Sequence, residues 1–114
     1  MIVARTSSTD VLRAIEYIEA NYPRIVDPGD VAGAIGADIN QLQKDLQSHI
    51  GCKIEAYVHR VRVSHAARIR REQDLKLYAI AREVGYKNDA MLRRNWKKVM
   101  GTLPTKQRRN NVAA

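Results

Sequence analysis

The side chains best able to do chemistry lie on two amphipathic segments, residues 39–50 and 89–100. At about 100° per residue, Arg93, Arg94 and Lys97 share one side of the later segment. The matching positions fifty residues earlier are also polar, and they are Asn40, Gln43, Lys44 and Gln47. Arginine can make a bidentate contact to guanine and an amide side chain to adenine, while lysine suits phosphate. These residue types favour hydrogen bonding to nucleic acid.

The same polar faces can also be plain solvated surfaces, which most amphipathic helices have. The charge distribution argues for a partner instead. The 114 residues include 20 Lys+Arg and 12 Asp+Glu, a net charge of +8. Residues 1–51 carry a net −3 (4 basic, 7 acidic) and residues 52–114 a net +11 (16 basic, 5 acidic). We expect a polyanionic partner, attracted mostly by the second half of the chain.

Helical periodicity predicts an all-α fold of about seven helices, and no useful length alternates at the period of a strand. The first helix should have Thr9 or Asp10 as its N-cap and should end at Pro23. Asp27 is the expected cap of the second. The expected helices lie within residues 8–22, 27–36, 39–50, 54–71, 77–84, 89–100 and, starting at Pro104, 104–109.

A short helix, a glycine turn and a second helix occur twice in tandem. The turns are at Gly36 and Gly85, and the second helices stop at Gly51 and Gly101. This is the layout of a helix-turn-helix motif, in which glycine accommodates the left-handed backbone that ends a helix. The predicted inward positions are Leu42, Leu46 and His49 or Ile50 in the first copy, and Leu92, Trp96 and Val99 in the second.

The long segment 54–71 connects the two copies. Its apolar stripe includes Ile54 and Val61, but Val63 points roughly opposite, so we expect the helix to be covered on more than one side. Arg62 lies beside the stripe, where it either anchors DNA weakly or pairs internally with an acid. The expected organisation is a first helix-turn-helix subdomain (1–51), a linking helix (52–72), a second subdomain (73–109) and a tail (110–114).

Two stretches, "VAGAIGADINQLQKDLQSHIGCKIEAYVHRVRVSHA" and "LYAIAREVGYKNDAMLRRNWKKVMGTLPTKQRR", resemble the DNA-binding domain of AraC/XylS-type transcription regulators. The likeness runs from about Val11 to Arg109. Its most specific positions are Ile80, Ala81, Gly85, Tyr86, Arg94, Trp96, Lys97, Lys98, Gly101, Pro104 and Arg108.

The resemblance implies a homeodomain-like pair of helix-turn-helix subdomains joined by a long central helix. It also implies a sequence-specific regulator that binds double-stranded DNA, with residues 39–50 and 89–100 in successive major-groove segments. The implied base-reading residues are Asn40, Gln41, Gln43, Lys44, Asp89, Ala90, Arg93 and Arg94. The candidates for contact with the DNA backbone are Gln47, Lys87, Asn88, Lys97, Lys98 and Arg108.

The resemblance also implies RNA polymerase as a partner and a bacterial, cytoplasmic, nucleoid-associated location. We expect the isolated domain to be a monomer. It is either a stand-alone regulator or the C-terminal domain of a longer one that carries an effector or dimerisation domain.

The sequence departs from the family pattern in several places. Leu46, Leu92 and Trp96 stand where the family usually has phenylalanine, a residue absent from this chain. Lys44 is the only basic residue on the first recognition helix, so the first motif either binds weakly or reads a narrow set of bases. Asp89 either accepts a hydrogen bond from cytosine or caps its own helix.

Other classes of function fit less well. His49, His59 and His65 lack metal-ligand spacing, and no nucleotide-binding or protease motif occurs, so we expect no enzyme, metal or cofactor. No apolar run is long enough for a membrane span. Cys52 is the only cysteine, which fits a reducing cytoplasm. The rival hypothesis is a non-specific RNA-binding or nucleoid protein, although RNA readers usually expose aromatic side chains.

Overall fold

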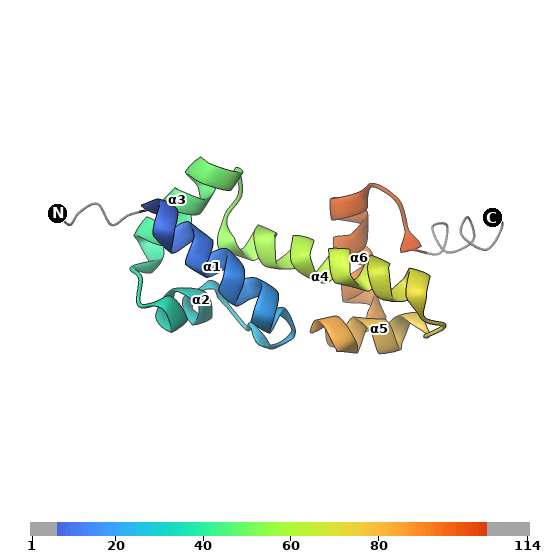
Figure 1. Ribbon diagram of the computed structural model, residues 1–114. Helices are drawn as coiled ribbons and strands as arrows, with labels where there is room; N and C mark the ends of the chain where they lie inside the picture. Colours follow the sequence, from blue (N-terminus) through green and yellow to red (C-terminus); the bar gives the residue numbers. More distant parts are fainter. Residues whose placement is uncertain (1–6, 105–114) are drawn as a thin grey trace. The chain divides into compact units, whose positions relative to one another are not determined.

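The computed structural model describes residues 7–104, and all regular structure within them is helical (Figure 1). The bounds are α1 Ser7–Asn21, the 3-10 turn η2 Tyr22–Arg24, α2 Pro28–Ile35, α3 Ile39–Ile50, α4 Ile54–Glu72, α5 Leu77–Val84 and α6 Asp89–Met100. These elements confirm the predicted all-α class. The expected last turn begins at Pro104, which is helical, and its remainder lies outside the described residues.

The start of α1 differs from the prediction. The helix begins at Ser7, so Thr9 and Asp10 lie in its first turn and do not cap it. Asp10 instead forms an ion pair with Arg13 at 3.6 Å. An acidic residue is favourable anywhere in the first turn because of the helix dipole, so its presence did not fix the cap position.

The turns of the two helix-turn-helix motifs share one backbone geometry. Gly36 after α2 and Gly85 after α5 are both left-handed, with φ of 71° and 106°. The next N–H in the second turn, that of Tyr86, donates to the Ala81 carbonyl at 2.8 Å, and the equivalent bond in the first turn is 2.9 Å. This pattern satisfies carbonyls at the helix end and requires φ > 0, which glycine adopts without steric cost. The following helix can therefore start at once in a new direction.

Each second helix begins with the same kind of cap. The Asp38 carboxylate accepts a hydrogen bond from the Gln41 backbone N–H at 3.0 Å, which starts α3. Fifty residues later, the Asn88 side chain accepts from the Met91 N–H at 2.9 Å and starts α6. A side-chain oxygen at this position satisfies a donor that the helix leaves open.

The chain forms two compact units, Met1–Val58 and His59–Ala114, which divide within α4. In the first unit α1 contacts α2 and α3, as Figure 1 shows. The core side chains of this unit are fully or nearly fully buried. They include Ala14, Ile18, Val31, Ile35, Leu42, Leu46 and Ile54.

The second unit has its own small core, and in it α5 contacts α6. Its fully buried side chains are Val63, Ala66, Ile80, Ala81, Val84, Leu92 and Trp96. Burial of Val63 as well as Ile54 agrees with the expectation that α4 is covered on more than one side. None of the helices within residues 7–104 is long and apolar enough to cross a membrane.

The predicted inward position Val99 is wrong, and of the alternatives His49 and Ile50 it is Ile50 that is partly buried. His49 is exposed, and its ring Nδ1 lies 2.9 Å from the Asp45 carbonyl oxygen. Val99 lies in the last turn of α6 and is 37% exposed. Asn95 is buried, and its amide nitrogen donates to the Met91 carbonyl at 2.9 Å, which satisfies this polar group within the helix.

Candidate nucleic-acid interface

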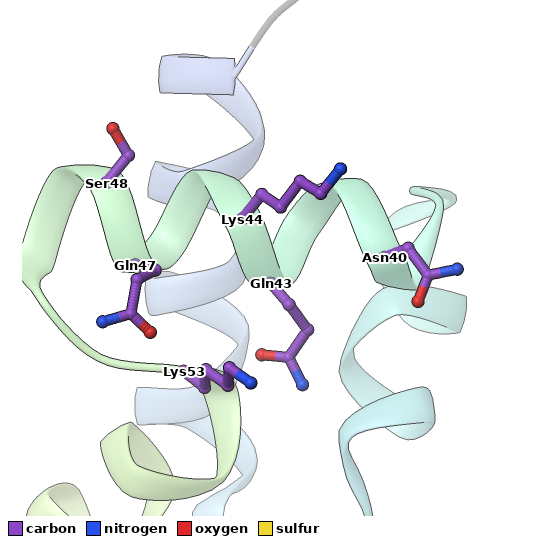
Figure 2. A pocket seen from close by; sticks show the side chains of 6 residues that line it. All are labelled: Asn40, Gln43, Lys44, Gln47, Ser48 and Lys53. Atoms are coloured by element: carbon purple, nitrogen blue, oxygen red, sulfur yellow. The ribbon is translucent and has the colours of Figure 1, made fainter.

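The outward side of α3 borders an open hollow in the first unit. Figure 2 shows the side chains around it, which come from α3 and from the loop before α4. In that view Gln43 and Lys53 extend toward the same space beside the helix. The lining residues are Asn40, Gln43, Lys44, Gln47, Ser48 and Lys53. Four of these six were predicted from the sequence as DNA-contacting residues.

The three glutamines predicted on this helix are engaged within the protein. Gln43 Oε1 accepts from the Ile54 backbone N–H at 2.8 Å. Gln41 Nε2 donates to Asp45 Oδ1 at 3.0 Å, and Gln47 Nε2 donates to the carbonyl that follows α3 at 3.3 Å. A bidentate contact to adenine needs both the oxygen and the nitrogen of an amide. While its bond to Ile54 is kept, Gln43 can offer a base only its Nε2 group.

Asn40 and Lys44 are the predicted residues of α3 with unengaged head groups. Both are exposed, and neither forms a hydrogen bond or ion pair with any residue in the described range. Lys53, an exposed cation at the same hollow, was not predicted from the sequence, nor was Ser48, which also lines it. These two residues belong to the first motif's outward surface as much as the predicted ones do.

The second unit has a corresponding hollow on the outward side of α6. It is lined by Arg93, Arg94, Lys97, Lys98 and Leu103, and all five are exposed. Four neighbouring cations in an open hollow raise the local positive potential and attract a polyanion. This hollow gathers four of the sixteen basic residues of positions 52–114.

The two hollows are built from equivalent positions. Every lining residue of the second has a counterpart fifty residues earlier in the first. The pairs are Gln43 and Arg93, Lys44 and Arg94, Gln47 and Lys97, Ser48 and Lys98, and Lys53 and Leu103. Extending the sequence repeat through the loop to Leu103 would have identified Lys53.

Asp89 does not cap α6, which was one of the two alternatives for this residue. The N-cap of α6 is Asn88, which was predicted to contact DNA, and Asp89 is the first helical residue. The Asp89 carboxylate forms an ion pair with Arg93, with Oδ2 and the guanidinium nitrogen 3.1 Å apart. Ala90 and Lys87 are exposed next to this pair, and Arg108 lies outside the described residues.

A buried cluster fixes the turn before α6. Tyr86, 3% exposed, stacks on His59 with the ring planes 4° apart, and its hydroxyl lies 2.6 Å from His59 Nδ1. The Arg62 guanidinium lies over the Tyr86 ring at 5.1 Å and also hydrogen-bonds to the phenol. Arg62, which the sequence placed either on DNA or against an acid, is thus buried against an aromatic ring.

Burial dominates the electrostatics of this cluster. It raises the pKa of Tyr86 to about 12, against the opposing attraction of the Arg62 cation. Burial likewise lowers the pKa of Arg62, while Tyr86 acts in the opposite direction. The phenol therefore stays protonated at neutral pH and can donate its hydrogen to His59 while it accepts from Arg62.

The two surfaces offer amide, hydroxyl and cationic groups on exposed helix faces. Within residues 7–104 there is no group of three or more His, Cys, Asp or Glu residues that could hold a metal ion. These groups can donate hydrogen bonds to an extended, negatively charged partner and attract it through their positive charge.

Residues 31–110 match a protein family described as a helix-turn-helix domain. One curated relative is the lactose operon transcription activator of Staphylococcus xylosus, 27% identical over 89 residues. The match covers 78% of this chain and 32% of that protein, so the chain spans about a third of the relative's length.

Solved structures share the fold. A transcriptional regulator with an AraC-type DNA-binding domain, from Chromobacterium violaceum, superposes with a TM-score of 0.85 at 17% identity, covering 92% of this chain and 94% of that one. The DNA-binding domain of the global transcriptional factor AdpA, solved in complex with a target DNA, gives a TM-score of 0.77 at 19% identity, with 94% and 93% covered.

Proposed function

The chain belongs to the AraC-type helix-turn-helix family of DNA-binding transcription regulators, which are not enzymes, and we propose that it reads a specific duplex sequence with α3 and α6. In this proposal each helix enters one of two successive major-groove segments. A major groove is wide enough for an α-helix and displays a distinct donor and acceptor pattern for each base pair.

One observation carries the proposal: the two hollows are lined by equivalent positions on two equivalent helices. Each helix follows a left-handed glycine turn and starts at a side-chain cap, so its outward face is set by the backbone. A plain solvated surface would not require the same geometry twice. Two copies of one DNA-reading helix would require it.

Exposed side chains that keep hydrogen-bond donors available support the choice of reading residues. We assign base contacts to Asn40 and Lys44 on α3 and to Arg93 and Arg94 on α6. Ala90 is exposed near the start of α6, where a methyl group can contact thymine. The remaining predicted readers have partners within the protein. Gln41 donates to Asp45, Gln43 accepts from the Ile54 N–H, and Asp89 forms an ion pair with Arg93.

The proposed phosphate contacts come from exposed lysines. Lys97 and Lys98 line the hollow on α6, Lys87 precedes that helix, and Lys53 lines the hollow on α3. The Asn88 side-chain oxygen caps the start of α6, and the Gln47 side-chain nitrogen donates to the carbonyl after α3. Any phosphate contact from these two residues uses the N–H groups that are not in these bonds. Arg108 remains a proposed phosphate contact.

The wider context is also a proposal. One curated relative is named as an activator, so RNA polymerase is a partner we propose for this chain as well. Because the proposed target is DNA, we propose that the protein acts in the cytoplasm, at the nucleoid. We propose that the chain binds its site as a monomer, because it carries two reading helices of its own.

Selection from a random duplex DNA library tests the proposal. We expect enrichment of one asymmetric motif with two conserved segments. Enrichment of no motif, with duplex and single-stranded RNA bound as well as DNA, would contradict sequence-specific reading and support a non-specific nucleic-acid-binding protein instead.

A further inference from the structure

We infer that Asp89 is a specificity-determining residue: it holds Arg93 for reading a base and discourages Arg93 from binding phosphate. The inference rests on the proposed function and assigns different roles to two adjacent arginines. Arg93 is paired with Asp89 at 3.1 Å, whereas Arg94 forms no ion pair with any residue in the described part of the chain.

The geometry of the pair directs Arg93 toward the end of α6 that reads bases. Asp89 lies one turn nearer the N-terminus, and side chains four residues apart meet on one face of a helix. An acid on the N-terminal side of its basic partner is the favourable order for such a pair. In helix-turn-helix proteins the N-terminal residues of the recognition helix contact base edges. The ion pair therefore holds the guanidinium where such contacts are made.

The pair leaves enough donors for reading. A guanidinium has five N–H donors, and one nitrogen of Arg93 contacts Asp89 Oδ2. The donors that remain can form the two parallel bonds to guanine N7 and O6. Both side chains are about half exposed, at 52% for Arg93 and 38% for Asp89, so a partner can approach.

The charge of Asp89 separates the two kinds of ligand. A phosphate on Arg93 would bring a second anion close to the carboxylate, and the two would repel each other. A guanine edge presents neutral acceptors and meets no such repulsion. Arg94 has no acid beside it and remains available to phosphate as well as to bases.

The equivalent residue on α3 is also held in place. Gln43 corresponds to Arg93, and its oxygen is bonded to the Ile54 N–H at 2.8 Å. Lys44 corresponds to Arg94, and like Arg94 it has no partner among residues 7–104. Each surface thus combines one restrained side chain with one unrestrained cation.

The test compares Asp89→Asn with Glu72→Gln in the full chain. Both remove one negative charge from an i,i+4 pair with arginine in the second unit, but the Arg68–Glu72 pair lies on α4 and does not line the hollow. The probes are the duplex obtained by selection and a scrambled duplex of the same composition. We expect Asp89→Asn to lower the ratio of the two affinities about fivefold to tenfold, mainly by tighter binding to the scrambled duplex. Glu72→Gln should leave the ratio within about twofold.

A double-mutant cycle separates positioning from a direct contact by Asp89. In an Arg93→Ala background, Asp89→Asn should no longer change the ratio, because its effect acts through Arg93. An equal change in both backgrounds would overturn the inference, and so would an unchanged ratio in the single variant. If the wild-type chain binds both duplexes equally, the proposed function fails and this inference fails with it. A wild-type preference that Asp89→Asn leaves intact would overturn the inference alone.

Discussion

The Gln43 side-chain oxygen accepts a hydrogen bond from the backbone N–H of Ile54 at 2.8 Å, so the middle of α3 is tied to the first residue of α4. Ile54 is fully buried, and its N–H belongs to the first turn of a helix, where no intrahelical acceptor is available. The bond therefore satisfies a backbone donor and fixes the loop that carries Lys53. Gln43, which was predicted from the sequence to read a base, therefore also has a structural role.

Gln43 and Asn40 should differ when each is replaced by alanine. Gln43→Ala leaves a backbone donor unsatisfied and should lower the free energy of unfolding by about 1–2 kcal/mol. Asn40→Ala should change stability by less than about 0.5 kcal/mol, because Asn40 is exposed and has no internal partner in the described residues. Urea unfolding measures both values. In binding, Asn40→Ala should relax the preference in one half of the site, and equal stability losses in the two variants would contradict this division.

Lys53→Gln should reduce the salt dependence of DNA binding. If the ammonium neutralises one phosphate, the slope of log K against log salt should become shallower by about 0.9. The loss of affinity should be similar on selected and scrambled duplexes, since phosphate contacts carry no sequence information. Arg24→Gln is the control, because it removes one charge from the same unit at an exposed position outside the hollow. Identical slopes for the two variants would mean that Lys53 acts only through net charge.

Tyr86 should make the protein lose stability in alkali. Its pKa is about 12 in the folded protein and near the ordinary value of 10.0 in the unfolded chain. Below pH 10 the Tyr86 phenol is protonated in both the folded and the unfolded state, so its full contribution to the free energy of unfolding is present. From pH 10 to 12 the unfolded state ionises first, so it binds fewer protons and the free energy of unfolding falls, by about 2–3 kcal/mol in all. Chemical denaturation at several pH values measures this change.

Tyr86→Phe provides the comparison for that pH dependence. The variant should be less stable at neutral pH, because the bonds to His59 and Arg62 are lost. Its additional decline between pH 10 and 12 should be much smaller than that of the wild type. A decline of the same size in both proteins would show that Tyr86 is not the group responsible.

Trp96→Phe should be tolerated despite the complete burial of the indole. Trp96 Nε1 is buried and has no hydrogen-bond acceptor within residues 7–104. Phenylalanine removes this unsatisfied donor, a gain of about 1–3 kcal/mol, and leaves a small cavity that costs about as much. The net change in unfolding free energy should be within about 1 kcal/mol, compared with a loss of about 2–5 kcal/mol for Leu92→Ala. A loss for Trp96→Phe as large as that for Leu92→Ala would contradict this balance between the removed donor and the cavity.

Local sequence signals predicted the helices well. Apolar spacing and the glycines at 36, 51, 85 and 101 determined where the helices end, because left-handed caps depend on a few neighbouring residues. The same signals could not distinguish Asn88 from Asp89 as the cap of α6, since both residue types cap well. They also misplaced the start of α1, where several neighbouring polar residues are of types that can cap a helix.

The details of the candidate site depended on contacts that spacing does not reveal. The Gln43–Ile54 bond joins residues eleven positions apart through a turn whose direction the sequence did not specify. Arg62 of α4 lies over the ring of Tyr86, which belongs to the turn between α5 and α6. Residue types identified the surfaces, but which head groups are free to bind could be decided only from the packed structure.

The most direct test of the two-helix account is a footprint on the duplex obtained by selection, combined with the stoichiometry of the complex. One chain should protect two major-groove segments whose centres are about 10 bp apart. Removing Asn40 and Lys44 should weaken one segment, and removing Arg93 and Arg94 should weaken the other. A two-fold symmetric footprint occupied only by a dimer would contradict the account, as would protection confined to the segment that depends on Arg93 and Arg94.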